Sequence, residues 1–210
     1  MTVSQSTDYA HNVFINCPFD DRYTQLFDSF IFAVMACRFV ARCALKIGDG
    51  SEVRIEKIFK IVSACRLGIH DLSRTELDPE HLLPRFNMPL ELGIFLGAKR
   101  FGGRPHRSKT ALILDTEKYR YQKFISDIAG QDIKAHGRQV DRSIHHIRDW
   151  LLSVSDDKEM PGADAIAGEY ADYLADLPQI CVKKRLNPAK LTFNDKTNLI
   201  FAWLEQSRKS

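Results

Sequence analysis

Several signatures of common enzyme classes are missing from this sequence of 210 residues. It contains no G-x-G-x-x-G fingerprint and no Walker A loop, which argues against a conventional dehydrogenase and against a P-loop enzyme. The G-x-S-x-G element of the α/β-hydrolases does not occur either. The first predicted turn between a strand and a helix, at residues 16–21, has no glycine that would bring backbone amides onto a pyrophosphate.

The sequence also has no large excess of positive or negative charge, no long apolar run and no closely spaced cysteine pair. Thirty basic residues stand against 27 acidic ones, so nothing favours nucleic acid as the main partner. No apolar run approaches the roughly 20 residues of a membrane helix, and the polar N-terminus is unlike a secretory signal. The five cysteines include no C-x-x-C pair, and we expect them to be reduced and mostly buried. We therefore expect a cytoplasmic globular protein with no membrane association.

Metal ligands and an activated thiol are not indicated. His136, His145 and His146 lack metal-ligand spacing with cysteines or carboxylates, so we expect these histidines on the surface or on helix faces. Cys17 and Arg22 form C-x4-R, one residue short of the C-x5-R spacing of a cysteine phosphatase loop. We predict a buried thiol at position 17 rather than a nucleophile, with no metal and no bound cofactor. The short basic clusters at 104–109 and 183–185 are more typical of solvated loops than of phosphate sites.

What the sequence does contain is an alternation of short β-rich runs and amphipathic helical patterns. The predicted strands are 13–15, 41–47, 67–70, 111–114 and 132–135, and helical patterns occur at 26–34, 55–65, 88–99, 119–129 and 140–154. We expect Asp20 or Asp21 to cap the first helix, Ser51 to cap the second, and Gly48-Asp49-Gly50 to end the second strand. Single helices between strands indicate βαβ units and an α/β fold with a parallel five-stranded sheet covered by helices on both faces. The number of strands favours the flavodoxin-like order 2-1-3-4-5.

The pattern changes beyond residue 155. Residues 156–162 are polar and contain a Pro-Gly step, which predicts a linker or an exposed loop. A helical stripe at 166–177 is expected to stop at Pro178, and a final helix is expected from 194 or 195 to about 206. We predict a nucleotide-pocket α/β domain at 1–155 and a helical C-terminal extension at 156–210, packed on that domain or on a partner subunit.

Candidate site residues come from one edge of the predicted sheet, because ligands bind outside the carboxyl ends of parallel strands. Three segments lie at this edge: 16–20, 70–73 and 87–91. The side chains there that could contact a ligand are those of Asn16, Pro18, Phe19, Ser73, Asn87 and Pro89. The candidates for chemistry are Asp71 and Glu91.

Glu91 is a lone carboxylate among apolar neighbours near a helix start, where the helix dipole favours the ionised form. A desolvated carboxylate is suited to attack or stabilise a cationic sugar carbon. The alternative is a first-turn glutamate that faces water, which is a common arrangement. Asp71 could accept a proton or bind a ribose hydroxyl, or it could bond its own loop backbone in an Asx-type turn. Asn16 has the same two interpretations.

Taken together, Asn-x-Pro-Phe at 16–19, Asp-Leu-Ser at 71–73 and Asn-Met-Pro-Leu-Glu-Leu-Gly at 87–93 resemble the nucleoside 2-deoxyribosyltransferase-like group, which is related in fold to TIR domains. The resemblance spans about residues 11–150, and Asn-x-Pro-x-Glu-x-Gly is its most specific part. It implies that Glu91 acts at the anomeric carbon of an N-glycosidic bond and that Asp71 helps to hold the base or the sugar.

The same resemblance implies a nucleoside or a nucleotide such as NAD as the substrate, a homo-oligomer, and for some members a role in antiviral defence with a defence-system partner. This chain departs from the group in lacking the usual glycine of the first turn and in its added helical tail, which leaves the substrate open. An alternative from another class is a catalytically inactive TIR-like module that senses a nucleotide or assembles on it. A third possibility is a structural interaction domain whose final helix docks on a partner.

Overall fold

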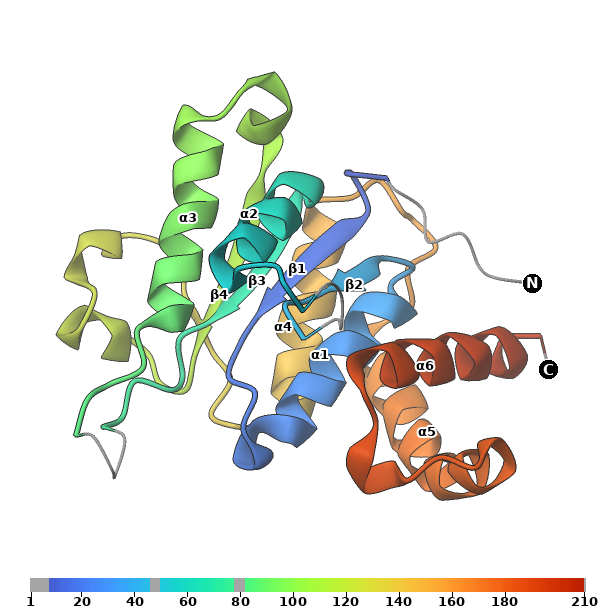
Figure 1. Ribbon diagram of the computed structural model, residues 1–210. Helices are drawn as coiled ribbons and strands as arrows, with labels where there is room; N and C mark the ends of the chain where they lie inside the picture. Colours follow the sequence, from blue (N-terminus) through green and yellow to red (C-terminus); the bar gives the residue numbers. More distant parts are fainter. Residues whose placement is uncertain (1–7, 46–49, 78–81, 210) are drawn as a thin grey trace.

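The computed structural model describes residues 8–45, 50–77 and 82–209. Five strands form a single sheet in the order β2-β1-β3-β4-β5, and every neighbouring pair is parallel (Figure 1). The strands are β1 (Asn12–Asn16), β2 (Val40–Arg42), β3 (Leu67–Asp71), β4 (Thr110–Asp115) and β5 (Lys134–Ala135). The predicted α/β class and flavodoxin-like strand order are confirmed.

Helices cover both faces of the sheet. The helices α1 (Thr24–Ala36) and α4 (Val140–Ser153) pack together on one face, and α2 (Arg54–Ala64) and α3 (Asn87–Phe101) pack together on the other. Alternate side chains of β1 serve the two layers, as the pleat of a strand requires. Val13 and Ile15 join the core under α1 and α4, whereas Phe14 packs with residues of α2 and α3. The sheet is therefore buried on both sides, which explains its nearly continuous apolar strands.

The C-terminal helices α5 (Ala163–Lys184) and α6 (Phe193–Ser207) lie against α1, on the side of the sheet away from α2 and α3 (Figure 1). Phe32 of α1 is fully buried, and its ring centroid lies 5.5 Å from that of Tyr173 and 6.0 Å from that of Trp203. Residues of β1, α1, α4, α5 and α6 belong to one continuous apolar cluster. The extension thus shares its core with the sheet domain.

The predicted helix at 119–129 is wrong. The chain forms two short 3-10 turns there, η3 (Arg120–Lys123) and η4 (Ser126–Ile128). Tyr119 has a left-handed backbone with φ +61°, and Ile125, with φ −149° and ψ 61°, separates the turns. The Arg120 side chain bonds to Asp115 and to the loop after β3, so tertiary contacts prevail over the helical pattern.

Two predicted caps and one predicted helix end are also wrong. The helix α1 begins after Tyr23, so neither Asp20 nor Asp21 is its cap, and the Asp20 side chain instead pairs with Arg74 at 3.0 Å. The helix α2 starts at Arg54 after Val53, so Ser51 is not its cap. The helix α5 continues through Pro178, which lies on its exposed side, where a carbonyl that loses its helical N–H can bond to water.

The remaining sequence expectations have mixed outcomes. The strand predicted at 41–47 ends at Arg42, and Gly48 and Asp49 lie outside the described residues. All five cysteines are buried and none forms a disulfide, as predicted. Within the ranges that the structure describes, no helix has both the length and the apolar character to cross a membrane. Three further 3-10 turns complete the described elements: η1 (Asp21–Tyr23), η2 (Arg104–Ser108) and η5 (Pro188–Lys190).

Candidate functional site

The strand order reverses between β1 and β3, and the carboxyl ends of these strands are where ligands bind in folds of this kind. Asn16 ends β1 and is 2% exposed. Its side-chain amide donates to the Met88 carbonyl at 2.9 Å and lies 3.0 Å from Nδ1 of His70. Asn16 therefore fixes the end of β1 against both the neighbouring strand and the first turn of α3.

Glu91 lies one turn further along α3. Its residue is only 6% exposed, so the alternative of a glutamate that faces water is wrong. Its carboxylate forms an ion pair at 4.0 Å with Arg54 and makes no hydrogen bond with any described residue. Burial raises the pKa of Glu91 to about 7, although the positive charge of Arg54 opposes this shift. The expectation of an ionised Glu91 does not hold. The cost of burying the charged carboxylate outweighs the attraction of the helix start and of Arg54 for it.

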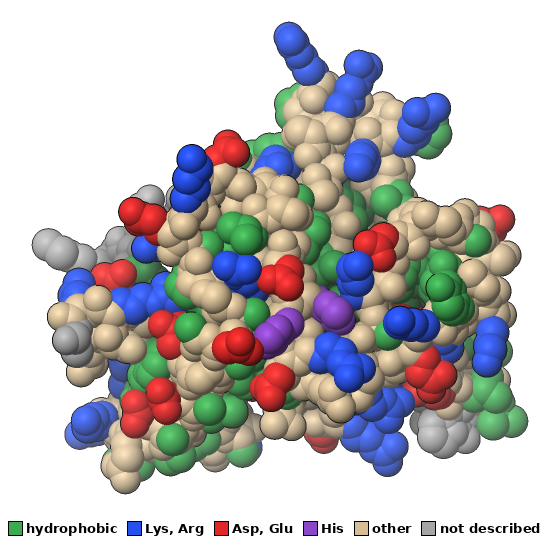
Figure 2. All heavy atoms as spheres, turned by 180° about the vertical axis from the view of Figure 1, so that it is seen from behind, with side chains coloured by type: hydrophobic (Ala, Val, Ile, Leu, Met, Phe, Trp, Pro, Cys, Tyr) green, Lys and Arg blue, Asp and Glu red, His purple; other side chains and the backbone are tan. Residues whose placement is uncertain are grey.

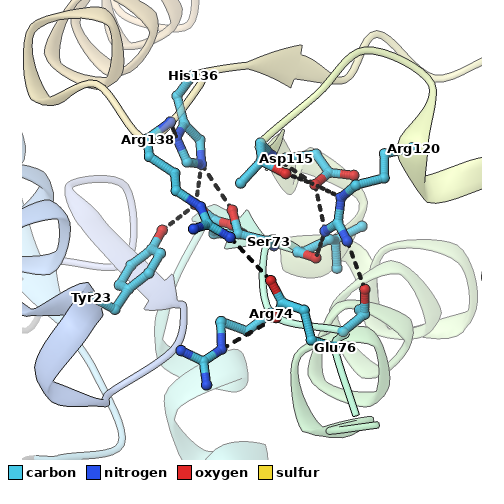
Figure 3. A network of polar contacts seen from close by, with 12 residues as sticks. Tyr23, Ser73, Arg74, Glu76, Asp115, Arg120, His136 and Arg138 are labelled. Carbon is cyan, nitrogen blue, oxygen red and sulfur yellow. Dashed lines mark hydrogen bonds and ion pairs between the residues drawn. The ribbon is translucent and has the colours of Figure 1, made fainter.

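Asp71 ends β3 and is buried, and its polar partners Tyr23, Ser73 and His136 are labelled in Figure 3. Its carboxylate accepts hydrogen bonds from the Tyr23 hydroxyl, from the backbone N–H of Ser73 at 2.7 Å and from the Ser73 hydroxyl. It also lies 2.9 Å from Nε2 of His136. Burial by itself would raise the pKa of Asp71, but the donors, led by His136, lower it below its usual value.

These contacts leave the Asp71 carboxylate little capacity to bind a ligand. The bond from the Ser73 amide is the Asx-type turn that the sequence left open, and the other donors occupy the remaining acceptor positions. The residue is 0% exposed. Asp71 is held as an enclosed anion, and this makes it a positioning residue rather than a group that touches a ligand.

His136, just after β5, is fully buried, so the expectation that it lies on the surface or a helix face is wrong. Its Nδ1 accepts the backbone N–H of Arg138 at 2.9 Å, which leaves the proton on Nε2. That nitrogen faces Asp71 and also the Ser73 hydroxyl, at 2.9 Å. Sequence reasoning missed His136 because Ser73 is 63 residues away along the chain and no local motif joins them.

Arginine side chains hold the loop after β3 in place. Arg120 bonds through Nε to Asp115 at 2.7 Å and through Nη1 to Thr75 at 2.8 Å, so it ties this loop to the end of β4. Arg74 pairs with Asp20 at 3.0 Å and ties the same loop to the turn after β1. One ion pair and the hydrogen bonds of Arg120 thus connect the loops at the carboxyl ends of the strands, and Figure 3 shows Arg120 beside Asp115.

The other predicted site residues differ in how far they are exposed to solvent. Pro18 and Ser73 are buried, Asn87 is exposed and Pro89 is half-buried in the first turn of α3. The ring of Phe19 meets Phe27 of α1 edge-on at 5.1 Å and packs against the core.

Gly93 and Cys17 belong to the same sequence motifs as the predicted site residues. Gly93 has no atom of another segment within 4 Å of where a Cβ would stand, so no other part of the described chain needs the space at this position. Cys17 is 1% exposed, and burial raises the pKa of its thiol well above the usual value. The prediction of a buried thiol at position 17 is therefore confirmed.

A groove of about 1000 Å³ lies elsewhere, between β5 and α4. Tyr121, residues 131–135 and His146 line it, and none of the predicted site residues does. Acidic, basic and histidine side chains are interspersed over the face opposite to the view of Figure 1 (Figure 2). The groove is separate from the strand ends that carry Asn16 and Asp71.

Among the described residues, no group of three or more His, Cys, Asp or Glu side chains is arranged to hold a metal ion. No protein-family model, curated protein or solved structure matches the chain. Its function has to be inferred from its own residues.

Proposed function

We propose that this protein cleaves the N-glycosidic bond of a nucleotide or nucleoside, and that Glu91 acts on the sugar. The observation that carries the proposal is a buried carboxylate, without a hydrogen bond to any described residue, near the start of α3, the helix to which Asn16 ties the end of β1. An isolated buried carboxylate with a raised pKa is a frequent mark of a functional site.

The electrostatics of Glu91 fit this chemistry. In the free protein its negative charge is poorly solvated, and Arg54 at 4.0 Å is the one positive charge among the described residues that offsets it. As the base leaves with the bonding electron pair, the sugar becomes cationic and supplies the missing positive charge. The interaction is stronger in the transition state than in the ground state, which is the condition for catalysis. Glu91 then either stabilises this cation until water adds or forms a bond to the anomeric carbon that water later breaks.

The other residues of the site act by position. Asn16 fixes the first turn of α3, and Asp71 with His136 holds the loop that follows β3. Asn87 is exposed at the first position of α3 and is available to bond a ligand. The resemblance to the nucleoside 2-deoxyribosyltransferase-like group supports this assignment and makes NAD a candidate substrate. The buried cysteines without disulfides fit a reducing cytoplasm, where we place the activity, in a homo-oligomer with a role in antiviral defence.

The test is release of free base. The purified protein is incubated with NAD and with a panel of nucleosides, and the products are separated by chromatography. Glu91→Gln keeps the shape of the side chain and removes its charge, and Glu56→Gln on the exposed side of α2 is the matched control. We expect base release from the wild type and from Glu56→Gln but not from Glu91→Gln. Equal release by all three proteins, or no release by any, contradicts the proposal.

One observation favours a second candidate, a nucleotide-sensing assembly module. Large apolar side chains are exposed around the loop before α3 and its first turn: Leu77, Leu83, Phe86 and Leu90. Exposed apolar patches mark association surfaces. This candidate predicts nucleotide-dependent oligomerisation that persists in Glu91→Gln, measured by light scattering.

A further inference from the structure

The end of α3 and the turn η2 form a lobe that lies away from the candidate site. Glu91 is near the start of α3, at the carboxyl ends of the strands, whereas η2 leads into the amino end of β4. Phe101, the last residue of α3, lies about 15 Å further along the helix than Glu91. Figure 1 shows the end of α3 and η2 projecting from the molecule, away from α5 and α6. We call residues 99–108 the basic lobe.

Positive charge gathers on the basic lobe. Its four exposed cations are Lys99, Arg100, Arg104 and Arg107. None of them makes a hydrogen bond or an ion pair with a described residue. No Asp or Glu occurs from residue 92 to residue 114, and the lobe at the top of Figure 2 carries Lys and Arg side chains but no acidic ones. The overall balance of charge in the chain therefore conceals a surface of one sign.

Gly102 brings the cations of α3 and of η2 onto one surface. Its N–H donates to the Ala98 carbonyl at 2.9 Å. A Cβ at this position would clash with the same carbonyl oxygen and would stand 2.9 Å from Cβ of His106. The absence of a side chain thus lets η2 fold back against the last turn of α3.

The segment before β1 also contacts the basic lobe. The Tyr9 hydroxyl donates to the Pro105 carbonyl at 3.0 Å, which ties η2 to this segment. The carboxylate beside Tyr9, that of Asp8, pairs with His11 and not with a cation of the lobe. The contact therefore supports the lobe without neutralising its charge.

Phe101 places an apolar ring among the cations. Its side chain is 87% exposed, the largest exposed fraction of any large apolar residue that the structure describes. An exposed aromatic ring beside several Lys and Arg side chains is typical of proteins that lie on anionic membranes. The ring enters the interface, and the cations are attracted to the lipid phosphates.

We infer that the basic lobe binds the surface of an anionic membrane, with Phe101 inserted at the level of the lipid head groups and the four cations against their phosphates. This inference is independent of the proposed function. The expectation of no membrane association came from the lack of long apolar runs, and surface binding needs none. A protein bound in this way keeps the carboxyl ends of its strands turned away from the membrane and open to soluble ligands.

A membrane fits the basic lobe better than a nucleic acid does. A cluster of about four to eight Lys and Arg residues is enough to recognise anionic lipids. Proteins that bind single-stranded nucleic acid use a basic groove along the backbone and stack successive bases on several aromatic rings. The lobe instead projects, and Phe101 is its one phenylalanine.

The experiment is sedimentation of the full chain with lipid vesicles, made of phosphatidylcholine alone or of equal parts of phosphatidylcholine and phosphatidylglycerol. The variants are Phe101→Ala and the double change Arg104→Gln with Arg107→Gln. The matched control is Lys183→Gln with Lys184→Gln, which removes the same charge from exposed positions at the end of α5. We expect the wild type and the control to sediment with the anionic vesicles and not with the neutral ones. The arginine variant should lower the partition coefficient by about 10- to 30-fold and Phe101→Ala by about 10-fold.

Several results would overturn the inference. Absence of binding, equal binding to neutral and anionic vesicles, or an equal loss in the arginine variant and in its control each removes the role of the lobe. An effect of the arginines without an effect of Phe101→Ala shows attraction without insertion and contradicts it as well. A single-stranded oligonucleotide is tested beside the vesicles. Tighter binding to the oligonucleotide than to the anionic vesicles, lost in the same variants, would assign the lobe to nucleic acid instead.

Discussion

The side-chain amide of Asn16 donates a hydrogen bond to the Met88 carbonyl at 2.9 Å. This bond joins the end of β1 to the helix turn that precedes Glu91, and both partners are buried. It makes the position of Glu91 depend on a residue that lies 72 positions earlier than Met88 in the sequence.

Asn16→Ala removes this bond between β1 and α3. We expect a loss of about 0.5–1.5 kcal/mol in the free energy of unfolding, the net contribution of one hydrogen bond. We also expect kcat for base release to fall more than KM rises, because the start of α3 moves relative to the strand ends. Chemical denaturation and steady-state kinetics measure the two effects. Unchanged stability and unchanged kcat together would show that this bond does not position Glu91.

The buried carboxyl of Glu91 predicts a pH dependence of stability. Its pKa is about 7 in the folded protein and near 4.5 when unfolded, so both states are protonated below pH 4.5 and the group then adds no penalty. As the pH rises from 4.5 to above 7, the unfolded state ionises first, and the free energy of unfolding falls by on the order of 3 kcal/mol. Glu91→Gln removes this loss and should therefore stabilise the protein at pH 8 but hardly at pH 4.5. Denaturation at both pH values gives the difference, and an equal effect at the two would contradict a raised pKa.

Removal of His136 should destabilise the fold through Asp71. His136→Phe takes one donor from a buried carboxylate, which costs about 3 kcal/mol at neutral pH. Because the folded pKa of Asp71 is lowered, the stability that it contributes is present above pH 3.8 and is lost as the pH falls through the folded value. The difference between wild type and variant should therefore narrow below pH 3.8. His145→Phe, at a half-exposed position on α4, is the control and should change stability by no more than about 0.5 kcal/mol.

The shared core of α1, α5 and α6 predicts that the C-terminal helices stabilise the whole protein. Phe32→Ala removes a fully buried ring that contacts Tyr173 and Trp203 and should cost about 3–5 kcal/mol. Phe201→Ala, on the half-exposed side of α6, should cost much less. Thermal unfolding compares the two, and similar losses would argue that Phe32 is not a core residue.

The sheet could be predicted from the sequence because its strands are short apolar runs with clear ends. Residues 111–114 are all apolar and end at Asp115, and β4 has nearly these bounds. The pattern at 119–129 misled because the arrangement of that segment depends on Arg120 and its distant partners Thr75 and Leu72. A helical pattern of apolar residues gives no information on contacts between residues so far apart in the sequence.

The site could be predicted only in part for the same reason. The position of Glu91 near a helix start follows from Pro89 in the first turn, but its burial depends on how α3 packs against α2 and the sheet. The network around Asp71 brings together residues from η1, β3 and the segment after β5, which have no neighbouring positions in the sequence.

The most direct test of the role of Glu91 is the pH dependence of kcat/KM for base release, measured beside Glu91→Gln. A carboxylate that must be ionised and has a pKa of about 7 predicts a rate that rises through pH 7 and levels off above it. The variant should show no measurable release across the same range. A wild-type rate that is flat from pH 5 to 9, or a variant that is as active as the wild type, would contradict the account.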